Sequence, residues 1–296
     1  MTTGHTQRDL GLAPDRPAAP FLKWAGGKGK LVGQLEPLLP PEFGRYIEPF
    51  AGGGAVFFHL HNAGRLAGRA VLADLNAELM NCYRVVRDRA CLAELIERLR
   101  RHAGHALDRD YYYRVRAWDR KPGYARRSPA ERAARTIFLN KTCYNGLYRE
   151  NSKAQFNVPY GKWRRPPRVL DEANLRACHR ALQAAELHNE GFEACLDWAR
   201  PGDFAYLDPP YDPLSSTASF TTYTGATFGR RDQERVASLF RELDGRGCRL
   251  LLSNSDTPLI RGLYRGFRTE TILARRSINS NAWRRGPIAE LAVMNY

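Results

Sequence analysis

The hydrophobic residues of the chain fall into short apolar runs that alternate with stretches of helical spacing. Each run is closed by polar, glycine or proline residues, which is typical of buried strands. We expect strands at residues 46–48, 70–73, 186–188, 204–207, 250–252, 267–273 and 291–296, and helices at 55–60, 175–182, 192–199 and 235–243. This alternation predicts an α/β fold, a Rossmann-like sheet with helices on both faces.

Residues 84–170 interrupt the alternation. Up to about residue 135 the pattern is helical, with an apolar face at Leu92, Leu95, Ile96 and Leu99. Further on, Asn145-Gly146 lies between β-favouring residues and predicts a hairpin turn. We therefore expect a mainly helical insertion with a β-hairpin at 84–170, and a sheet domain assembled from residues 21–83 and 171–296.

The apolar run 204–207 is followed directly by Asp208-Pro209-Pro210-Tyr211. The prolines cannot donate to a sheet ladder, so the strand ends and Asp208 lies at its carboxyl edge, where open α/β sheets bind ligands. Proline restricts its own φ and the preceding residue, which holds the carboxylate and the Pro209 carbonyl stiffly. With the Tyr211 ring beside them, these groups suit a planar base with an exocyclic amino group. A simple proline-rich turn is the alternative.

A glycine-rich turn, Glu48-Pro49-Phe50-Ala51-Gly52-Gly53-Gly54, follows the first strand and precedes a helix. Such a turn lets the backbone approach a nucleotide-like ligand at a helix N-terminus. Asp74 ends the next strand, 22 residues after Gly52, about where an acidic side chain binds a ribose hydroxyl in dinucleotide folds. Glu48 would repel a pyrophosphate and attract an ammonium group, which favours S-adenosylmethionine over NAD.

A second glycine-rich segment spans residues 21–30. Gly26-Gly27 allows close backbone approach, Lys28 supplies a cation and Trp24 a stacking face. These groups suit a ligand that carries a carboxylate and a ring. A basic glycine turn without a ligand explains them equally well.

The formal net charge of the 296 residues is +15, and its distribution is uneven. Residues 84–170 hold 22 Lys and Arg against 8 Asp and Glu, whereas the remainder holds 24 against 23. A basic block beside a neutral body indicates a polyanion site, and nucleic acid is favoured over an anionic membrane because no clear amphipathic helix with an exposed apolar face is present. In residues 139–165 aromatic residues alternate with Arg, Lys and Asn, types that stack on or hydrogen-bond to bases, among them Asn157 and Lys162.

Several other classes of protein are disfavoured. No apolar run approaches the roughly 20 residues of a membrane span. Residues 1–20 are polar and lack the apolar centre of a secretion signal, so we expect a disordered tail on a cytoplasmic protein. The six cysteines lack zinc-site spacing and are expected to be reduced core residues, and His59 and His61 point different ways on a helix. We expect no metal.

Taken together, the motifs resemble the DNA adenine methylase (Dam) family of S-adenosylmethionine-dependent N6-adenine methyltransferases. The resemblance runs from residue 21 to near the C-terminus. It rests on the segments at 21–28, 48–54, Ala73-Asp74-Leu75-Asn76, Tyr144-Asn145-Gly146-Leu147, Phe156-Asn157-Val158-Pro159, Asp208-Pro209-Pro210-Tyr211 and Ser277-Ile278-Asn279-Ser280-Asn281.

This resemblance implies roles for individual residues. S-adenosylmethionine would be contacted by Trp24, Lys28, Asp74 and Asp208, alongside Glu48, Phe50, Gly52 and Gly54 of the glycine-rich turn, and Asp208 would also be catalytic with Pro209, Pro210 and Tyr211. The basic block would be the target recognition domain. There the resemblance implies DNA contacts by Tyr144, Asn145, Leu147, Arg149 as the guanine reader, Pro159 and Ser215.

The expected activity is methyl transfer to N6 of an adenine flipped out of duplex DNA, with GATC as the target sequence. Glu150 stands where some family members carry an aromatic residue, which leaves the target sequence open. The alternatives are a methyltransferase for another DNA site or for RNA, and a non-catalytic DNA-binding module on the same fold. A cognate restriction endonuclease is a conceivable partner, and a monomer suffices for the chemistry.

Overall fold

The computed structural model describes residues 16–66, 69–213, 228–275 and 287–296. Seven strands form one sheet: β1 (Tyr46–Glu48), β2 (Ala70–Ala73), β3 (Ala185–His188), β4 (Phe204–Leu207), β5 (Arg249–Ser255), β6 (Arg268–Arg275) and β7 (Pro287–Met294). Each predicted strand is present. Two motifs assigned from the sequence, Ser215 and the segment at 277–281, lie outside the described residues.

The sheet has the order β3-β2-β1-β4-β5-β7-β6. The first five strands in this order run parallel, and β7 runs antiparallel to both β5 and β6. The chain proceeds outward from β1 to β2 and β3 and then returns to place β4 on the other side of β1. The carboxyl ends of β1 and β4 therefore form a topological switch point, where doubly wound sheets bind ligands.

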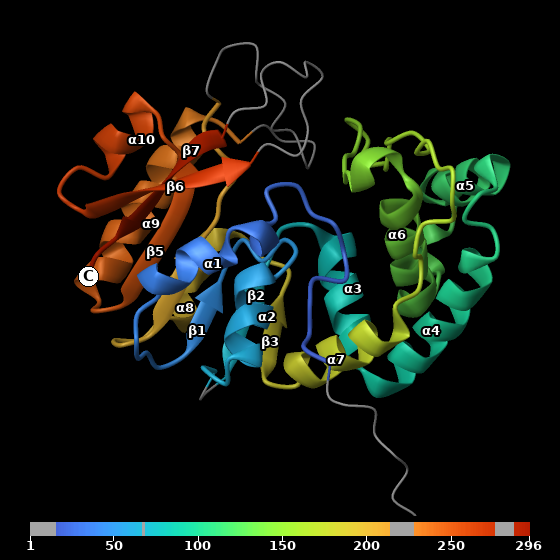
Figure 1. Ribbon diagram of the computed structural model, residues 1–296, viewed down its shortest axis with the longest axis horizontal. Coiled ribbons are helices and arrows are strands. Elements are labelled where there is room, and N and C mark those ends of the chain that lie inside the picture. Colours follow the sequence, from blue (N-terminus) through green and yellow to red (C-terminus); the bar gives the residue numbers. More distant parts are fainter. Residues whose placement is uncertain (1–15, 67–68, 214–227, 276–286) are drawn as a thin grey trace, which may run out of the picture.

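Helices cover both faces of this sheet, as predicted (Figure 1). Alternate strand residues point to opposite faces: Tyr46 and Tyr206 pack in one core, Ile47 and Ala205 in the other. The described helices are α1 (Val32–Leu35), α2 (Ala55–Asn62), α3 (Ala77–Arg87), α4 (Arg89–Ala103), α5 (Arg109–Arg116), α6 (Pro129–Thr142), α7 (Glu172–Leu182), α8 (Cys195–Trp198), α9 (Arg230–Gly245) and α10 (Pro258–Leu263), with short 3-10 helices at η1 (Lys28–Lys30), η2 (Glu36–Leu38), η3 (Ala117–Arg120), η4 (Tyr124–Arg126), η5 (Tyr144–Gly146) and η6 (Phe192–Ala194).

The basic block contributes α4, α5 and α6, which stand beside α3 on the side away from β4 to β7 (Figure 1). Their apolar faces share one continuous core with the sheet face that carries Tyr46. The predicted boundary after residue 83 falls within α3, whereas the boundary after residue 170 falls just before α7. The division into two domains remains a prediction.

The insertion contains an antiparallel segment between Cys143 and Tyr160, and its chain reversal lies at a different position from the predicted hairpin turn. Asn145-Gly146 does form a tight turn, with φ of 56° and 66°, but isolated bridges pair Cys143 with Tyr160 and Glu150 with Phe156. The chain therefore reverses at 151–155, where the Asn151 N–H donates to the Gln155 carbonyl. The Asn-Gly signal was correct locally, and the reversal occurs one short segment later.

Of the tail predicted for residues 1–20, residues 1–15 lie outside the described part of the chain. Residues 16–20 belong to the folded chain, because Asn62 and Asn174 each bind both the N–H and the carbonyl of one tail residue, Ala18 and Ala19 respectively. Ala18 is buried. Side-chain amides from α2 and α7 thus supply hydrogen-bond partners for this backbone. The polar, Pro- and Ala-rich sequence of the segment gives no sign of these long-range contacts.

Candidate active site and nucleic-acid surface

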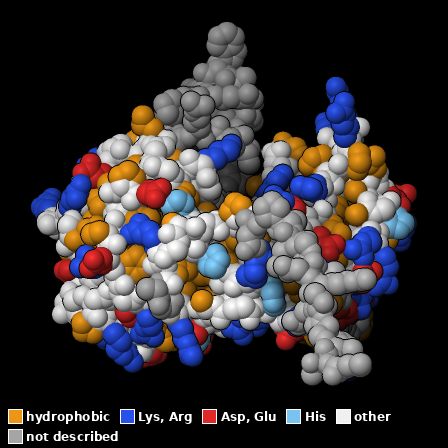
Figure 2. Space-filling model, turned by 60° about the horizontal axis from the view of Figure 1, so that its bottom comes forward, with side chains coloured by type: hydrophobic (Ala, Val, Ile, Leu, Met, Phe, Trp, Pro, Cys, Tyr) orange, Lys and Arg blue, Asp and Glu red, His pale blue; other side chains and the backbone are white. Residues whose placement is uncertain are grey.

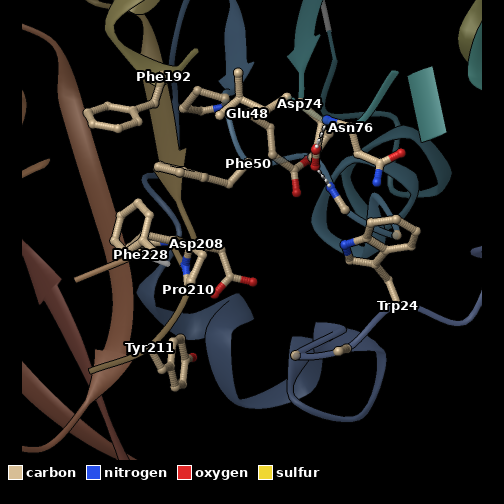
Figure 3. A pocket seen from close by; sticks show the side chains of 18 of the residues that line it. Trp24, Glu48, Phe50, Asp74, Asn76, Phe192, Asp208, Pro210, Tyr211 and Phe228 are labelled. Atoms are coloured by element: carbon tan, nitrogen blue, oxygen red, sulfur yellow. Dashed lines mark hydrogen bonds between the residues drawn. The ribbon is translucent and has the colours of Figure 1, made fainter. Parts of the chain in front are cut away.

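A cavity of about 520 Å³ lies at the switch point of the sheet (Figure 3). Its walls come from the glycine-rich segment that contains Trp24, from the ends of β1 and β2, and from the loop after β4. The cavity brings together all of the residues predicted to bind cofactor except Gly54, and all four predicted to be catalytic. Gly54 lies just beyond, as the left-handed residue before α2. Segments far apart in sequence therefore meet in one place.

Asp208 lies at the end of β4 and points into the cavity (Figure 3). Lys28 Nζ lies 2.8 Å from its Oδ1, in the geometry of an ion pair, and the Lys28 side chain is only 3% exposed. Burial raises the pKa of Asp208 to about 6, and the Lys28 charge opposes this increase. The same ammonium lies 4.6 Å from the centre of the Tyr211 ring. A cation is thus favoured both by the carboxylate and by the aromatic face.

Polar side chains from neighbouring elements hold the Asp-Pro-Pro-Tyr loop. Gln233 of α9 donates to the Pro210 carbonyl at 2.8 Å, and the Tyr211 hydroxyl donates to Glu290 of β7 at 2.7 Å. The Asn254 side chain, at the end of β5, accepts from the Asp212 N–H and donates to Gln233. These bonds fix the loop backbone and the Tyr211 ring on elements that the sequence motif does not include.

The glycine-rich turn is closed by Asp74. Its Oδ2 accepts the Gly52 N–H at 3.1 Å and its Oδ1 accepts the Asn76 N–H at 2.8 Å. Burial raises the pKa of Asp74 to about 6. Gly52 has φ +46°, and a Cβ there would lie 2.8 Å from Cδ1 of Trp24. The indole therefore packs directly on the turn, a contact that only glycine permits.

Glu48 is buried at the end of β1, where its Oε2 accepts the Tyr46 hydroxyl at 2.9 Å. Burial raises the pKa of Glu48 to about 8, with a further contribution from the negative charge of Asp208. Asp74 and Asp208 therefore supply the negative charge of the cavity near neutral pH, whereas Glu48 keeps its proton there. An acidic cavity fits a ligand that carries positive charge, and it disfavours a pyrophosphate.

An aromatic cluster at one end of the cavity was not predicted. The Phe50 ring stacks on Phe192 with centroids 5.3 Å apart and meets Phe228 edge-on at 6.3 Å (Figure 3). The Arg235 guanidinium lies over the Phe192 ring, 5.2 Å from its centroid. The sequence places Phe192 only at the start of a helix, and no local signal marks Phe50 or Phe228 as its neighbour. The cluster offers flat apolar faces for a ring.

Trp24 also contacts the basic block. Its ring stacks on Tyr148, with centroids 4.9 Å apart and an interplanar angle of 29°. The Tyr148 hydroxyl donates to Glu150 Oε1 at 2.5 Å, beside Arg149 in the chain. The sequence does not predict this contact, because an aromatic residue among basic ones can equally pack in the core, contact a base or stack on a distant ring.

The residues predicted to bind DNA, apart from Ser215, lie on or next to the antiparallel segment between Cys143 and Tyr160. Tyr144, Asn145, Arg149, Pro159 and Lys162 are exposed, and Leu147 and Asn157 are half-buried. The Tyr144 N–H donates to the Pro159 carbonyl at 2.9 Å, and Arg149 Nε donates to Asn157 Oδ1 at 2.8 Å. The structure therefore gathers them into two adjoining groups, one around the Asn145 turn and one around Arg149.

Part of the positive charge of the basic block serves the fold. Arg135 is buried and paired with Asp119 at 2.6 Å, and Asp119 also accepts the Phe156 N–H. Arg120 donates to the Phe156 carbonyl, and Arg116 to the Val158 carbonyl. These side chains position the extended segment that carries Asn157. On the face in Figure 2, Lys and Arg lie over both the sheet and the helical part.

No cluster of three or more His, Cys, Asp or Glu within the described ranges could hold a metal ion. Among the described helices, none combines the length and the apolar character needed to cross a bilayer.

The fold and the cavity define a Rossmann-like α/β enzyme with an acidic, aromatic-lined site at the switch point of its sheet. The family model described as "D12 class N6 adenine-specific DNA methyltransferase" matches residues 24–278. The chain belongs to this family, and the predicted class of enzyme, an adenine-specific DNA methyltransferase, is confirmed.

Three curated relatives illustrate the similarity. The type II methyltransferase M.MjaIII of Methanocaldococcus jannaschii is 42% identical, covering 94% of this chain and 99% of the relative. The type II methyltransferase M1.LlaDCHI of Lactococcus lactis is 40% identical, covering 94% and 95%. The DNA adenine methylase of Escherichia coli K12 is 34% identical, covering 93% and 94%. The chain thus aligns with both type II methyltransferases and Dam-named enzymes over nearly their whole length.

Proposed function

We propose that the enzyme transfers a methyl group from S-adenosylmethionine to N6 of an adenine that is flipped out of duplex DNA. One observation carries this proposal: the Asp74 turn and the Asp208 corner open into a single cavity. A donor held at the first and a base held at the second would lie within reach of each other. Proximity and orientation of two reactants supply a large share of the rate in such transfers.

The residues present fit the proposed donor. S-adenosylmethionine supplies a methyl group on a positively charged sulfonium, so the reaction needs no further activation of the leaving group. Asp208 offers negative charge to its cationic groups, Glu48 offers a carboxyl group that can release its proton to pair with one of them, and Asp74 offers acceptor oxygens to a ribose. The rings of Phe50, Phe192 and Phe228 offer stacking faces to an adenine.

At the Asp208 corner, the chain would hold the target base. The adenine cannot be reached inside a stacked duplex, so it must be extruded at a cost of a few kcal/mol. Tyr211 would stack on the base, and the Asp208 carboxylate and the Pro209 carbonyl would accept its two amino hydrogens. These hydrogen bonds aim the nitrogen lone pair at the methyl group. The carboxylate also stabilises the positive charge that develops on nitrogen.

The exposed residues of the antiparallel segment would read the duplex. Arg149 presents its guanidinium at the surface with Nε already bonded to Asn157, which leaves the two terminal nitrogens for a bidentate contact with guanine. Tyr144, Asn145 and Leu147 would enter or support the site that the flipped base vacates. Pro159 and Lys162, with Ser215, complete the proposed contact surface.

The test is transfer of a labelled methyl group from S-adenosylmethionine to duplex oligonucleotides. GATC is the first sequence to assay, beside duplexes with each position changed, a single-stranded form and an RNA of the same sequence. We expect methylation of duplex DNA at adenine, and loss of turnover with retained duplex binding in Asp208→Ala. Asp212→Asn is the matched control, because this carboxylate lies in the same loop but bonds Thr257. Preferred methylation of the RNA, or full turnover in Asp208→Ala, would contradict the proposal.

A further inference from the structure

A single buried amide joins the proposed DNA-reading turn to the segment that carries Trp24 and Lys28. Asn140 belongs to α6, and its side chain is 0% exposed. Its Oδ1 accepts the Lys23 N–H at 2.8 Å. Its Nδ2 donates to the Lys23 carbonyl at 2.8 Å and to the Gly146 carbonyl at 3.1 Å. Both amide hydrogens are therefore used, one for each segment.

The two segments are also packed against each other. Gly146 has φ +66°, and a Cβ there would lie 2.3 Å from Cδ and 3.1 Å from Cβ of Lys23. The Asn145-Gly146 turn thus packs on the Lys23 side chain, while the Asn140 side chain bonds the backbones of both segments. A shift of the turn cannot leave Lys23 in place without opening this contact.

On its other side, the same segment leads straight to the cavity. The Trp24 carbonyl, next to Lys23, accepts the Gly27 N–H at 3.0 Å and so closes a turn. Lys28 follows this turn and lies 2.8 Å from Asp208. The Trp24 ring meanwhile packs on Gly52 and stacks on Tyr148. The short segment from Lys23 to Lys28 therefore connects the Asn140 hydrogen bonds to the ion pair with Asp208, the proposed catalytic carboxylate.

We propose that Asn140 is a positioning residue that couples duplex binding at the Asn145-Gly146 turn to cofactor binding at the Trp24–Lys28 segment. This inference rests on the proposed function. If either carbonyl moved away from Asn140, a buried amide hydrogen and a carbonyl would both lose their hydrogen bond, which costs free energy. The turn and the segment are therefore expected to move as one unit. A duplex that fixes the turn also fixes the segment. Each ligand therefore tightens the other by the same factor.

The chain supplies a matched control in Asn174. This residue of α7 is also buried, accepts the Ala19 N–H at 3.0 Å and donates to the Ala19 carbonyl at 2.8 Å. It therefore makes the same two-bond contact with the same N-terminal stretch. Unlike Asn140, Asn174 has no hydrogen bond to the Asn145-Gly146 turn. A role limited to holding this stretch predicts equal effects from both asparagines.

The experiment measures the dissociation constant of S-adenosylhomocysteine by calorimetry, alone and with a saturating duplex that the unmodified chain methylates. We expect the duplex to tighten binding by at least about fivefold in the unmodified chain and in Asn174→Ala. In Asn140→Ala the ratio of the dissociation constant without duplex to that with duplex should fall to about one. Thermal unfolding of both variants checks that they are folded to a similar extent.

A second variant keeps the inference testable if Asn140→Ala does not fold. Gly146→Ala leaves α6 intact but forces the turn away from Lys23, and it should also reduce the ratio to about one. Equal ratios in all variants, or a ratio of one in the unmodified chain, would overturn the coupling while leaving the proposed function intact. An unmodified chain that binds neither ligand would instead overturn the proposed function.

Discussion

Lys28 and Asp208 form a buried ion pair at the centre of the cavity, with Nζ 2.8 Å from Oδ1. The lysine comes from the N-terminal glycine-rich segment and the carboxylate from the end of β4, so the pair ties together two parts of the site. The ion pair also influences the protonation of Asp208. Burial raises the pKa of the carboxyl group, and the neighbouring ammonium limits the increase to a value of about 6.

Removing this ammonium should shift the pH dependence of methylation. In Lys28→Met the pKa of Asp208 rises further, because burial is no longer opposed by a positive charge. The carboxylate form is the one that accepts the amino hydrogens, so the acid limb of the rate profile should move to higher pH. Single-turnover rates between pH 5 and pH 9, at saturating cofactor, measure this shift. Lys30→Met removes a nearby charge that does not line the cavity and should leave the midpoint in place; the same midpoint in Lys28→Met would contradict the role of the pair.

The strand ends of the site were predictable from the sequence because they are local features. An apolar run followed by Glu48, Asp74 or Asp208 defines a carboxyl end without any knowledge of distant residues. Parallel strands bring these ends to one edge, so the cavity follows from the order of the motifs. The glycines were predictable for the same reason, since the positive φ of Gly52 is a property of one turn.

The supporting contacts were not predictable because they join residues far apart in the chain. Nothing near Tyr148 indicates that its ring stacks on Trp24, and nothing near Asn140 indicates a bond to Lys23. The position of β7 between β5 and β6 likewise depends on pairing energies along whole strands, not on a local signal. A turn such as Asn145-Gly146 can be recognised from the sequence, but the pairing of the segments that follow it depends on residues further along the chain.

The contact between Gly52 and Trp24 predicts a selective loss of cofactor binding. In Gly52→Ala a Cβ would lie 2.8 Å from the indole, and φ +46° is unfavourable for a residue with a side chain by about 1–2 kcal/mol. The ring must shift, so we expect the dissociation constant of S-adenosylhomocysteine to rise about tenfold or more, which corresponds to about 1.4 kcal/mol.

Gly53→Ala provides the comparison within the same turn. A Cβ at this position would meet nothing closer than 3.6 Å, and its φ is not in the left-handed region. Calorimetry should therefore show near-normal cofactor binding in Gly53→Ala. Duplex binding by both variants should be retained in the absence of cofactor. Equal losses of cofactor binding in the two variants would show that the Trp24 contact is not the cause.

Arg149 should determine the preference for one base pair. Its Nε bond to Asn157 orients the guanidinium, and a bidentate contact with guanine is worth about 1–3 kcal/mol of discrimination. Arg149→Ala should lose that amount on the cognate duplex and little on a duplex changed at that position. Lys162→Ala should weaken all duplexes alike and reduce the salt dependence by about one counterion. Competition binding with single-position variants of the duplex separates the two patterns, and a uniform loss in Arg149→Ala would identify a phosphate contact instead.

Glu48 should make the stability of the fold depend on pH. The pKa of this carboxyl group is about 8 in the folded chain, against an ordinary value of 4.5. Between these two values the folded state retains a proton that the unfolded chain has lost. The free energy of unfolding therefore falls as the pH rises through this interval, because the unfolded state binds fewer protons. Glu48→Gln is neutral throughout and still offers an oxygen to the Tyr46 hydroxyl, so it removes the penalty.

The difference in melting temperature between Glu48→Gln and the unmodified chain should thus grow in favour of the variant from pH 5 to pH 9. Differential scanning calorimetry at several pH values measures it. Glu42→Gln, at an exposed position away from the cavity, should show no such trend. A difference that stays constant across this range would mean that the buried carboxyl group ionises normally. In that case the acidity of the cavity would be set by Asp74 and Asp208 together with a charged Glu48, and a cationic ligand would bind without releasing a proton from it.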